Sequence, residues 1–450
     1  MHSFKTMQMK FEKLNSFKNL TLVTLFIFNT ATINAQSTPK SLSMEEAIQA
    51  ALQNNKQLLI AKTDEAIAKS NFNQTEAIWL PNVNLSQTAY RTNNPLNVFG
   101  FKLQQSNVLQ ADFNPALLNN PNNYSNYNTQ LALQQPIINL DALYMRKSAK
   151  EQVGMYAAQV QRTKEAIKMQ VVQSYLYLEF TYQYEKVTIE GLKTMQSIYK
   201  FTKDRFDQGM MQKSDLLNVA VQVQAAELQH SQAKSQIENI SDQLTVLMGA
   251  PKGVVYSIKP YNLGTQTDVS DSVSSGRSDI RALNAAVNSY DMAIKSTEMG
   301  WMPKLNGFAN YNINDKSIAF NGAKSYIAGV QLSWDIFKGN QMNRKAATQR
   351  LEKSKVQEQL NSQLETGAAE IRKTKRAVVD ANYKIQQQTT SVQQSEEALR
   401  ILQNRYEQGL ISTNDILVAQ TQLSQQKLFL AQAQLEQKSA INYLEFLTTK

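Results

Sequence analysis

The sequence predicts a membrane protein of the α+β class, in which three chains share one twelve-stranded β-barrel and each chain supplies four strands. The first observation behind this prediction is an internal duplication of the chain. The second is a very long stretch of helix-forming sequence in each copy, far longer than the helices of ordinary globular domains. The third is a set of short segments of alternating polarity. Four strands cannot close a barrel alone, so several copies must contribute strands.

The N-terminal segment has the composition of a secretory signal peptide. A lysine-rich region precedes an apolar run from Leu20 to Phe28, and Ile33-Asn34-Ala35 is a suitable cleavage site. We therefore expect residues 1–35 to be removed after Ala35. The alternative is an N-terminal membrane anchor, but the apolar run is shorter than the ~20 residues that a membrane-spanning helix needs.

The composition excludes several kinds of chemistry. The chain has no cysteine, which rules out disulfides and thiolate sites, and it has only two histidines. His230 has no second histidine nearby to complete a metal site, so we expect it to face solvent. The net charge of +10 is scattered rather than gathered on a basic, aromatic-rich platform, which argues against a nucleic-acid partner. We expect no enzyme, no cofactor and no bound metal.

The first helix of each copy is expected to be short. Ser43-Met44-Glu45-Glu46 has the pattern of a capping box and is followed by apolar residues at helical spacing. The corresponding helix of the second copy is expected over residues 279–300. A Trp-x-Pro sequence follows in both copies and ends at Pro81 in the first and at Pro303 in the second.

Strands are expected after these prolines. The clearest alternation runs over residues 326–336, although Ile327 breaks it, and a second lies over residues 83–89. Residues 127–135 and 304–311 alternate less cleanly. Apolar-out, polar-in strands with aromatic residues near their ends are typical of a membrane barrel wall, but a soluble sheet with one buried face gives the same pattern. The first copy also carries an Asn- and Pro-rich insertion between Pro81 and Leu133, which we expect to be a surface loop.

The long helices are expected over residues 139–208 and 338–408, which contain no proline. At ~1.5 Å per residue each would be on the order of 100 Å long. The return helices, residues 214–248 and 414–447, are about half as long, so the short first helices are expected to lie beside the other half. The apolar stripe along these helices is narrow, as in a coiled coil.

Each long helix is expected to end in a hairpin tip. The sequence Arg205-Phe206-Asp207-Gln208-Gly209 returns as Arg405-Tyr406-Glu407-Gln408-Gly409. The glycine can adopt the left-handed conformation that ends a helix, and Ser214 or Asn414 can cap the helix that follows. The chain therefore divides into a signal peptide (1–35), a first repeat (36–250), a linker (251–278) and a second repeat (279–450).

Over its whole mature length the chain resembles the TolC-like outer-membrane efflux proteins. The resemblance rests on Leu42-Ser43-Met44-Glu45-Glu46-Ala47-Ile48, on helix-to-strand junctions at Pro81 and Pro303, and on the two glycine tips. Arg277-Ser278-Asp279-Ile280-Arg281 opens the second repeat much as in the family, but Ser278 replaces the usual proline.

The resemblance implies an outer-membrane trimer whose barrel, set in lipid, continues as a long α-helical barrel across the periplasm of a Gram-negative cell. It also implies two partners, a periplasmic adaptor and an inner-membrane pump of the RND, ABC or MFS type. The trimer would then be the outer-membrane duct through which an efflux or type I secretion system exports its substrates. The adaptor would meet the two tips, and acidic residues would close the periplasmic entrance. The tip residues are Gln208, Gly209, Met210, Gln408, Gly409 and Leu410, and the candidates for the gate are Glu396 and Glu397.

Two other functions are compatible with parts of the sequence. A periplasmic coiled-coil scaffold would share the helices but would not need lipid-facing strands. A passive porin would share the signal peptide and the barrel but would not need such long helices.

Overall fold

The computed structural model describes residues 39–449 except for 262–269 and 319, and these residues belong to one compact unit that begins at Pro39. The expected signal peptide lies outside the described residues, and so does part of the expected linker.

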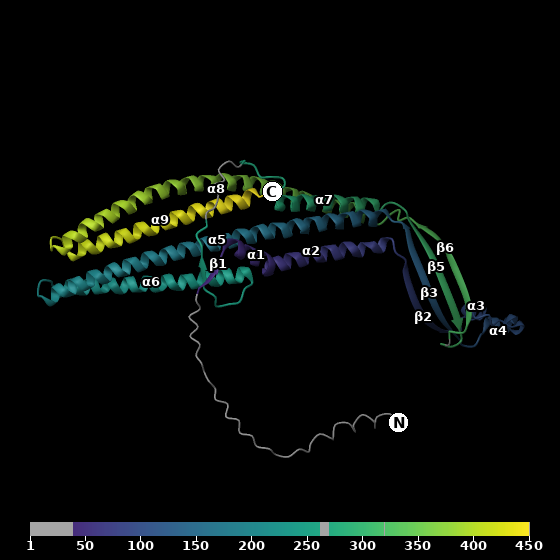
Figure 1. Ribbon diagram of the computed structural model, residues 1–450. Helices are drawn as coiled ribbons and strands as arrows, with labels where there is room; N and C mark the ends of the chain where they lie inside the picture. The colour runs from purple at the N-terminus through teal and green to yellow at the C-terminus, as the bar shows by residue number, and fades with distance from the viewer. Residues whose placement is uncertain (1–38, 262–269, 319, 450) are drawn as a thin grey trace, which may run out of the picture. The chain divides into compact units, whose positions relative to one another are not determined.

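Two helical hairpins form the longest part of the fold (Figure 1). The first consists of α5 (Leu140–Asp207) and α6 (Lys213–Met248), and the second of α8 (Gln341–Glu407) and α9 (Thr413–Thr448). At about 1.5 Å per residue, α5 and α8 are each on the order of 100 Å long. The two hairpins also pack on each other, because α5 contacts α9 along its length. The predicted bounds of the long helices differ from the observed ones by only a few residues.

Shorter helices run beside the parts of α5 and α8 that α6 and α9 do not reach (Figure 1). They are α1 (Met44–Asn54), α2 (Lys56–Gln74) and α7 (Ser278–Met299). The capping box at Ser43 is present, since Glu46 N–H donates to the Ser43 hydroxyl and the Glu46 carboxylate accepts from Ser43 N–H. α7 begins at Ser278, one residue before the expected start at Asp279.

A four-stranded antiparallel sheet joins the helices at the end remote from the hairpin tips (Figure 1). Its strands are β2 (Asn82–Thr92), β3 (Tyr124–Ile138), β5 (Lys304–Asp315) and β6 (Ala323–Ser333), in that spatial order. Within the described residues β2 and β6 are edge strands, each with one unpaired side. The alternation over residues 326–336 continues past the end of β6, so its last residues lie outside the sheet.

The insertion between β2 and β3 is partly helical, which corrects the expectation of a plain surface loop. It contains α3 (Pro95–Gln104), the 3₁₀ turn η2 (Gln110–Phe113) and α4 (Pro115–Asn119). Both α-helices begin with proline at the first position, behind Asn94 and Asn114, whose side chains accept backbone N–H groups. Proline suits this position because its missing N–H would be unpaired there in any case.

A second, smaller sheet was not predicted. β1 (Lys40–Leu42) pairs in parallel with β4 (Tyr256–Ile258), which follows the first repeat. Tyr175 of α5 ties this pair to the helices, since its hydroxyl donates to the Leu42 carbonyl at 3.0 Å and accepts from Lys259 N–H at 3.2 Å. Burial raises the pKa of the Tyr175 hydroxyl, which stays protonated as a donor.

The largest apolar cluster lies where α1, α5 and α6 meet β1 and β4. Ala47, Val171, Leu178 and Leu244 are completely buried there. Elsewhere the buried side chains follow a narrow stripe along each long helix, as the sequence predicts. Within the described part of the chain, no helix is both long and apolar enough to cross a membrane.

Candidate functional site

The strand register separates a polar and an apolar face of the four-stranded sheet. The polar face extends from the pair Asn306–Gln331 at one end of the sheet to the pair Thr92–Tyr124 at the other. Its side chains are uncharged, and amides are the most frequent kind among them. Ile327, which breaks the alternation in the sequence, lies on this polar face opposite Asn310. The amide side chains of the polar face are Asn82, Asn84, Asn126, Asn128, Gln130, Gln134, Asn306, Asn310, Asn312, Asn314 and Gln331.

The opposite face is apolar and exposed. Tyr326 and Leu85 are 82% and 70% accessible in a single chain, although both are large apolar side chains. Such a contiguous exposed surface marks contact with lipid or with another protein. The other exposed members of this face are Val83, Leu131, Leu133, Tyr311, Val330 and Leu332.

The two prolines lie where helices give way to strands. Pro81 lies between the 3₁₀ turn η1 (Thr75–Ile78) and β2, and Pro303 lies between α7 and β5. The chain has three tryptophans, and all of them lie here: Trp79, Trp301 and Trp334. Trp334 Nε1 donates to the Trp301 carbonyl at 3.0 Å. Tryptophan rings at one end of a lipid-facing sheet are typical of the membrane–water interface.

Both hairpin tips have the same backbone geometry. In each, the glycine N–H and the following N–H donate to carbonyls of the preceding helix turn, and the glycine has positive φ. At the first tip Gly209 has φ 76° and Met210 N–H donates to Arg205, and at the second Gly409 has φ 75° and Leu410 N–H donates to Arg405. This is the Schellman arrangement, which any residue with a β-carbon would strain.

The caps of the return helices differ from the prediction. The expected caps, Ser214 and Asn414, both lie inside helices, because α6 begins at Lys213 and α9 begins at Thr413. Ser412 caps α9 in a capping box with Asp415, whereas Gln212 precedes α6 without a side-chain cap.

The apolar pairs after the glycines divide into an exposed and a packed residue. Met210 and Leu410 are 70% and 68% accessible. Met211 and Ile411 instead pack against the cluster that joins the two hairpins. The second residue of each pair therefore closes its hairpin, and the first is free to contact another protein.

A polar and aromatic contact holds the two tips together within one chain. Tyr406 is almost fully buried, and its hydroxyl lies 2.8 Å from the Thr202 hydroxyl. The Arg205 guanidinium donates to the Glu407 carbonyl at 2.7 Å and stacks on Phe201. These residues were not singled out from the sequence, although Arg205 and Tyr406 both belong to the duplicated motif.

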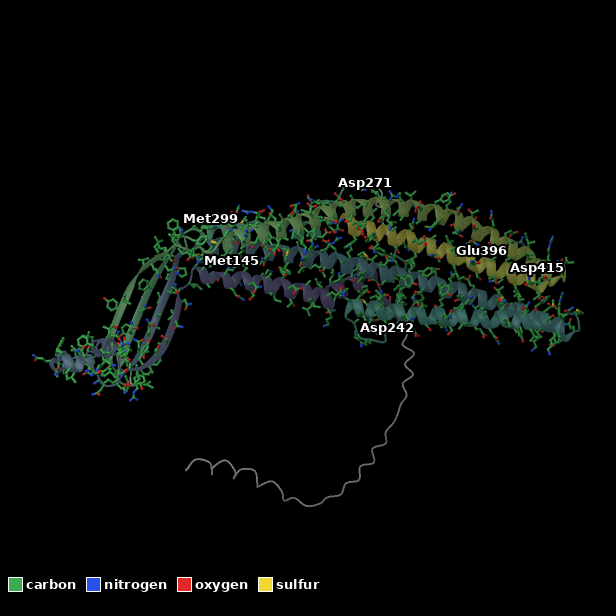
Figure 2. All side chains as sticks on the ribbon, turned by 180° about the vertical axis from the view of Figure 1, so that it is seen from behind. Met145, Asp242, Asp271, Met299, Glu396 and Asp415 are labelled. Carbon is green, nitrogen blue, oxygen red and sulfur yellow. The ribbon has the colours of Figure 1, made fainter. Side chains whose placement is uncertain are left out.

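The two candidate gate acids have different surroundings. Glu396 of α8 contacts Lys427 of α9 at 3.0 Å, and the same ammonium lies 3.3 Å from Glu190 of α5. Figure 2 shows Glu396 set back from the tip, where Asp415 lies. Burial alone would lower the pKa of Lys427, but the carboxylates of Glu396 and Glu190 raise it above its usual range.

Among the described residues, Glu397 forms its ion pair within its own helix, with Arg400 at 2.7 Å. The hydrogen bond from Arg400 lowers the pKa of this exposed carboxylate. Only Glu396 therefore takes part in a contact between helices. The sequence did not identify Lys427, because its partners lie on other helices, Glu396 on α8 and Glu190 237 residues away on α5.

The described residues contain no group of three or more acidic or histidine side chains that could hold a metal ion. His230, which we expected to face solvent, is half-buried, and its Nδ1 has no hydrogen-bond partner among the described residues.

A sequence family matches most of the chain. Residues 47–250 and 269–449 match the outer membrane efflux protein family. The chain belongs to this family. Its members are channel proteins rather than enzymes, and this places the chain in the outer membrane, extending into the periplasm, as an efflux channel. Among curated proteins, no sequence matches this chain.

Solved structures of outer-membrane channels share the fold. The CmeC outer membrane channel of Campylobacter jejuni is 18% identical, with a TM-score of 0.77 over 90% of this chain and 85% of that one. The outer membrane protein VceC of Vibrio cholerae is 17% identical, with a TM-score of 0.73 over 90% of this chain and 95% of that one. The open state of the MtrE outer membrane channel of Neisseria gonorrhoeae is 14% identical, with a TM-score of 0.70 over 90% and 88%.

Proposed function

We propose that three copies of this chain form an export duct, in which their sheets close a twelve-stranded barrel in the outer membrane. Their helices would continue the duct as an α-helical barrel across the periplasm. The two repeats, residues 36–250 and 279–450, are the proposed structural units, residues 251–278 link them, and residues 1–35 are the proposed signal peptide.

The observation that carries this proposal is the four-stranded sheet with an exposed apolar face and two open edges. In lipid, unpaired backbone groups at a sheet edge cost several kcal/mol each, so a lipid-facing sheet must be closed. One chain has too few strands to close it. Pairing β2 of one copy with β6 of the next removes both edges and directs the polar, amide-rich face inward.

The hairpin tips are the proposed docking points for a periplasmic adaptor. The surface comprises Gln208, Gly209 and Met210 of the first tip and Gln408, Gly409 and Leu410 of the second. Its support is that Met210 and Leu410 are exposed at equivalent places on two tips of the same geometry. An inner-membrane pump of the RND, ABC or MFS type would supply the energy, because the chain belongs to a family of channels.

The periplasmic entrance is the proposed gate, and Glu396 is its better candidate. Opening the entrance requires the two hairpins of one chain to move apart. The contact of Lys427 on α9 with Glu190 on α5 joins the two hairpins and would oppose that movement, and Glu396 on α8 pairs with the same ammonium from within the second hairpin. Glu397 stays a candidate with less support, since its partner is on the same helix.

The first experiment determines location and mass. The full chain is expressed in a Gram-negative cell, inner and outer membranes are separated, and the protein is extracted in detergent and measured by light scattering. We expect an outer-membrane species of about three mature chains. A detergent-free periplasmic species would refute the duct and favour the coiled-coil scaffold.

A second experiment separates an export duct from a passive porin. Met210→Asp and Leu410→Asp place charge on the exposed residue of each tip. We expect loss of adaptor-dependent export with the trimer mass unchanged, because these side chains contribute nothing to the packed cluster. If the variant that carries both substitutions still exports at the full rate, the docking role of the tips is refuted.

A further inference from the structure

The insertion between β2 and β3 contacts the polar face of the sheet through the end of α3. We call residues 93–123 the cap segment. Gln105, at the end of α3, fastens it: its amide donates to Asn126 Oδ1 at 2.9 Å and to the Asp315 carbonyl at 3.2 Å. Tyr124 donates from its hydroxyl to Gln105 Oε1 at 2.8 Å. The bonds reach three positions on two strands, so the orientation of α3 on the sheet is fixed.

The side chains of Tyr90, Tyr124 and Asn126, which contact the cap segment, belong to the polar face. Phe101 stacks on Tyr90 with ring centroids 5.5 Å apart, and Lys102 lies over the Tyr124 ring. Asn126 is 1% accessible and donates to Asn314 Oδ1 at 3.0 Å. The strand register puts these four sheet residues, Tyr90, Tyr124, Asn126 and Asn314, on one face.

The cap segment is folded but leaves apolar side chains exposed. Val98 is buried, Phe99 packs edge-on against Phe113, and Lys102 pairs with Asp112. Hydrogen bonds from Lys102 and from the Leu109 backbone lower the pKa of Asp112, which keeps this pair charged. Several large apolar side chains remain uncovered: Leu96, Leu103, Leu109, Phe113 and Leu117.

A second copy of this chain is the occupant that the geometry favours. Lipid contacts the opposite face in the proposed barrel, so it is not available to side chains that stand on the polar face. The cap segment also begins directly after β2, which is the edge strand that a neighbouring copy must pair. When three sheets close, the cap segments all enter the same enclosed space at the outer end. Apolar side chains that meet there leave water, and this favours the contact between copies.

We propose that the cap segments of neighbouring copies contact one another through these apolar side chains and narrow the outer exit of the duct. This inference rests on the proposed trimer. The rest of the polar face, which the cap segment does not cover, carries uncharged side chains. The cap segment would therefore form a constriction at the outer exit, separate from the one at the periplasmic entrance.

Single cysteines test the contact, since the chain has none of its own. Leu96→Cys and Leu109→Cys are introduced one at a time, and the trimer in outer membranes is treated with a short bifunctional maleimide. We expect cross-linked dimers and trimers of the chain. The control is Tyr326→Cys, which is equally exposed but lies on the apolar face, where counterparts in a ring point away from each other. It should give no cross-link.

The functional consequence is tested by conductance in planar bilayers. Replacing residues 95–119 with a short Gly-Ser turn removes the cap segment, and Gln105→Ala releases it without a deletion. We expect both variants to conduct more than the wild-type trimer. An intact trimer with no cross-link at either position, or with unchanged conductance in both variants, would overturn the cap and leave the duct standing. Cross-links to a different protein would assign the surface to that partner instead. Absence of a trimer would overturn the proposed function and the cap together.

Discussion

Replacing Gly367 by alanine tests how α8 packs against the residues just before α7. Gly367 lies inside α8, directly against the linker residues Val273 and Arg277. A β-carbon there would lie 2.8 Å from Val273 Cγ2 and 3.0 Å from Arg277 NH1. Arg277 cannot move aside easily, because it is 1% accessible and donates to both carboxylate oxygens of Asp279, from Nε at 2.7 Å and from NH2 at 2.8 Å.

Two effects of opposite sign determine the free energy of unfolding. Alanine favours a helix over glycine by roughly 0.5–1 kcal/mol. Forcing an extra carbon into a tightly packed site costs about 1–3 kcal/mol. We therefore expect Gly367→Ala to destabilise the protein by about 1 kcal/mol, with the displaced Arg277–Asp279 pair as the main cause.

Gly154 provides the matched control. It is also a helix-interior glycine, in α5, but a β-carbon there would meet no atom within 4 Å. Gly154→Ala should therefore stabilise the protein by roughly 0.5–1 kcal/mol. Thermal unfolding of the detergent-extracted protein, followed by circular dichroism, measures both variants. The reasoning is refuted if Gly367→Ala raises the melting temperature as Gly154→Ala does.

Three further predictions concern the tips and the linker. Ser412→Ala removes the capping box of α9 and should cost about 1 kcal/mol, which is measured as faster amide hydrogen exchange in the first turn of α9. The control is Gln212→Ala, which should leave the exchange rate in the first turn of α6 nearly unchanged, because Gln212 does not cap that helix. Tyr406→Phe removes one buried hydrogen bond between the hairpins, which should cost about 1 kcal/mol. Amide hydrogen exchange at the end of α8 should therefore be about fivefold faster, and an unchanged exchange rate would contradict this prediction. Burial alone would raise the pKa of Asp279, but the hydrogen bonds from Arg277 lower it below its usual value of about 3.9. The charged Asp279 therefore stabilises the folded protein fully above that value, and this stabilisation is lost as the pH falls through the lower pKa of the folded state. The gap in melting temperature between wild type and Asp279→Asn should therefore shrink below about pH 4, and a constant gap would rule out this linkage.

The sequence predicted the elements that depend on local chemistry. The ends of α5 and α8 follow from Gly209 and Gly409, because only a residue without a β-carbon easily adopts the positive φ that closes these tips. The capping box at Ser43 is likewise visible in four consecutive residues. The bounds of the long helices could be predicted because proline is absent from both and helical patterning continues throughout.

Other features escaped prediction for identifiable reasons. Asn94-Pro95 and Asn114-Pro115 are start signals for helices, but the abundance of asparagine and proline around them indicated a loop. The Ser412 cap was overlooked because its capping box ends in Asp415 rather than in Glu or Gln. The contacts of Lys427 and Gln105 join segments that are distant in sequence, and no local pattern encodes them.

The parallel pairing of β1 with β4 has a consequence for the order in which the chain folds. β1 lies before α1 and β4 follows α6, so the two strands cannot meet until the chain has been synthesised through both helices of the first hairpin. Bringing such distant ends together costs chain entropy before any contact compensates for it, which makes the step slow. Once formed, the pair encloses the elements from α1 to α6 as a loop whose ends are fixed together. The first hairpin can then be complete before the second emerges, which reduces the chance that its long apolar stripe pairs with the wrong helix.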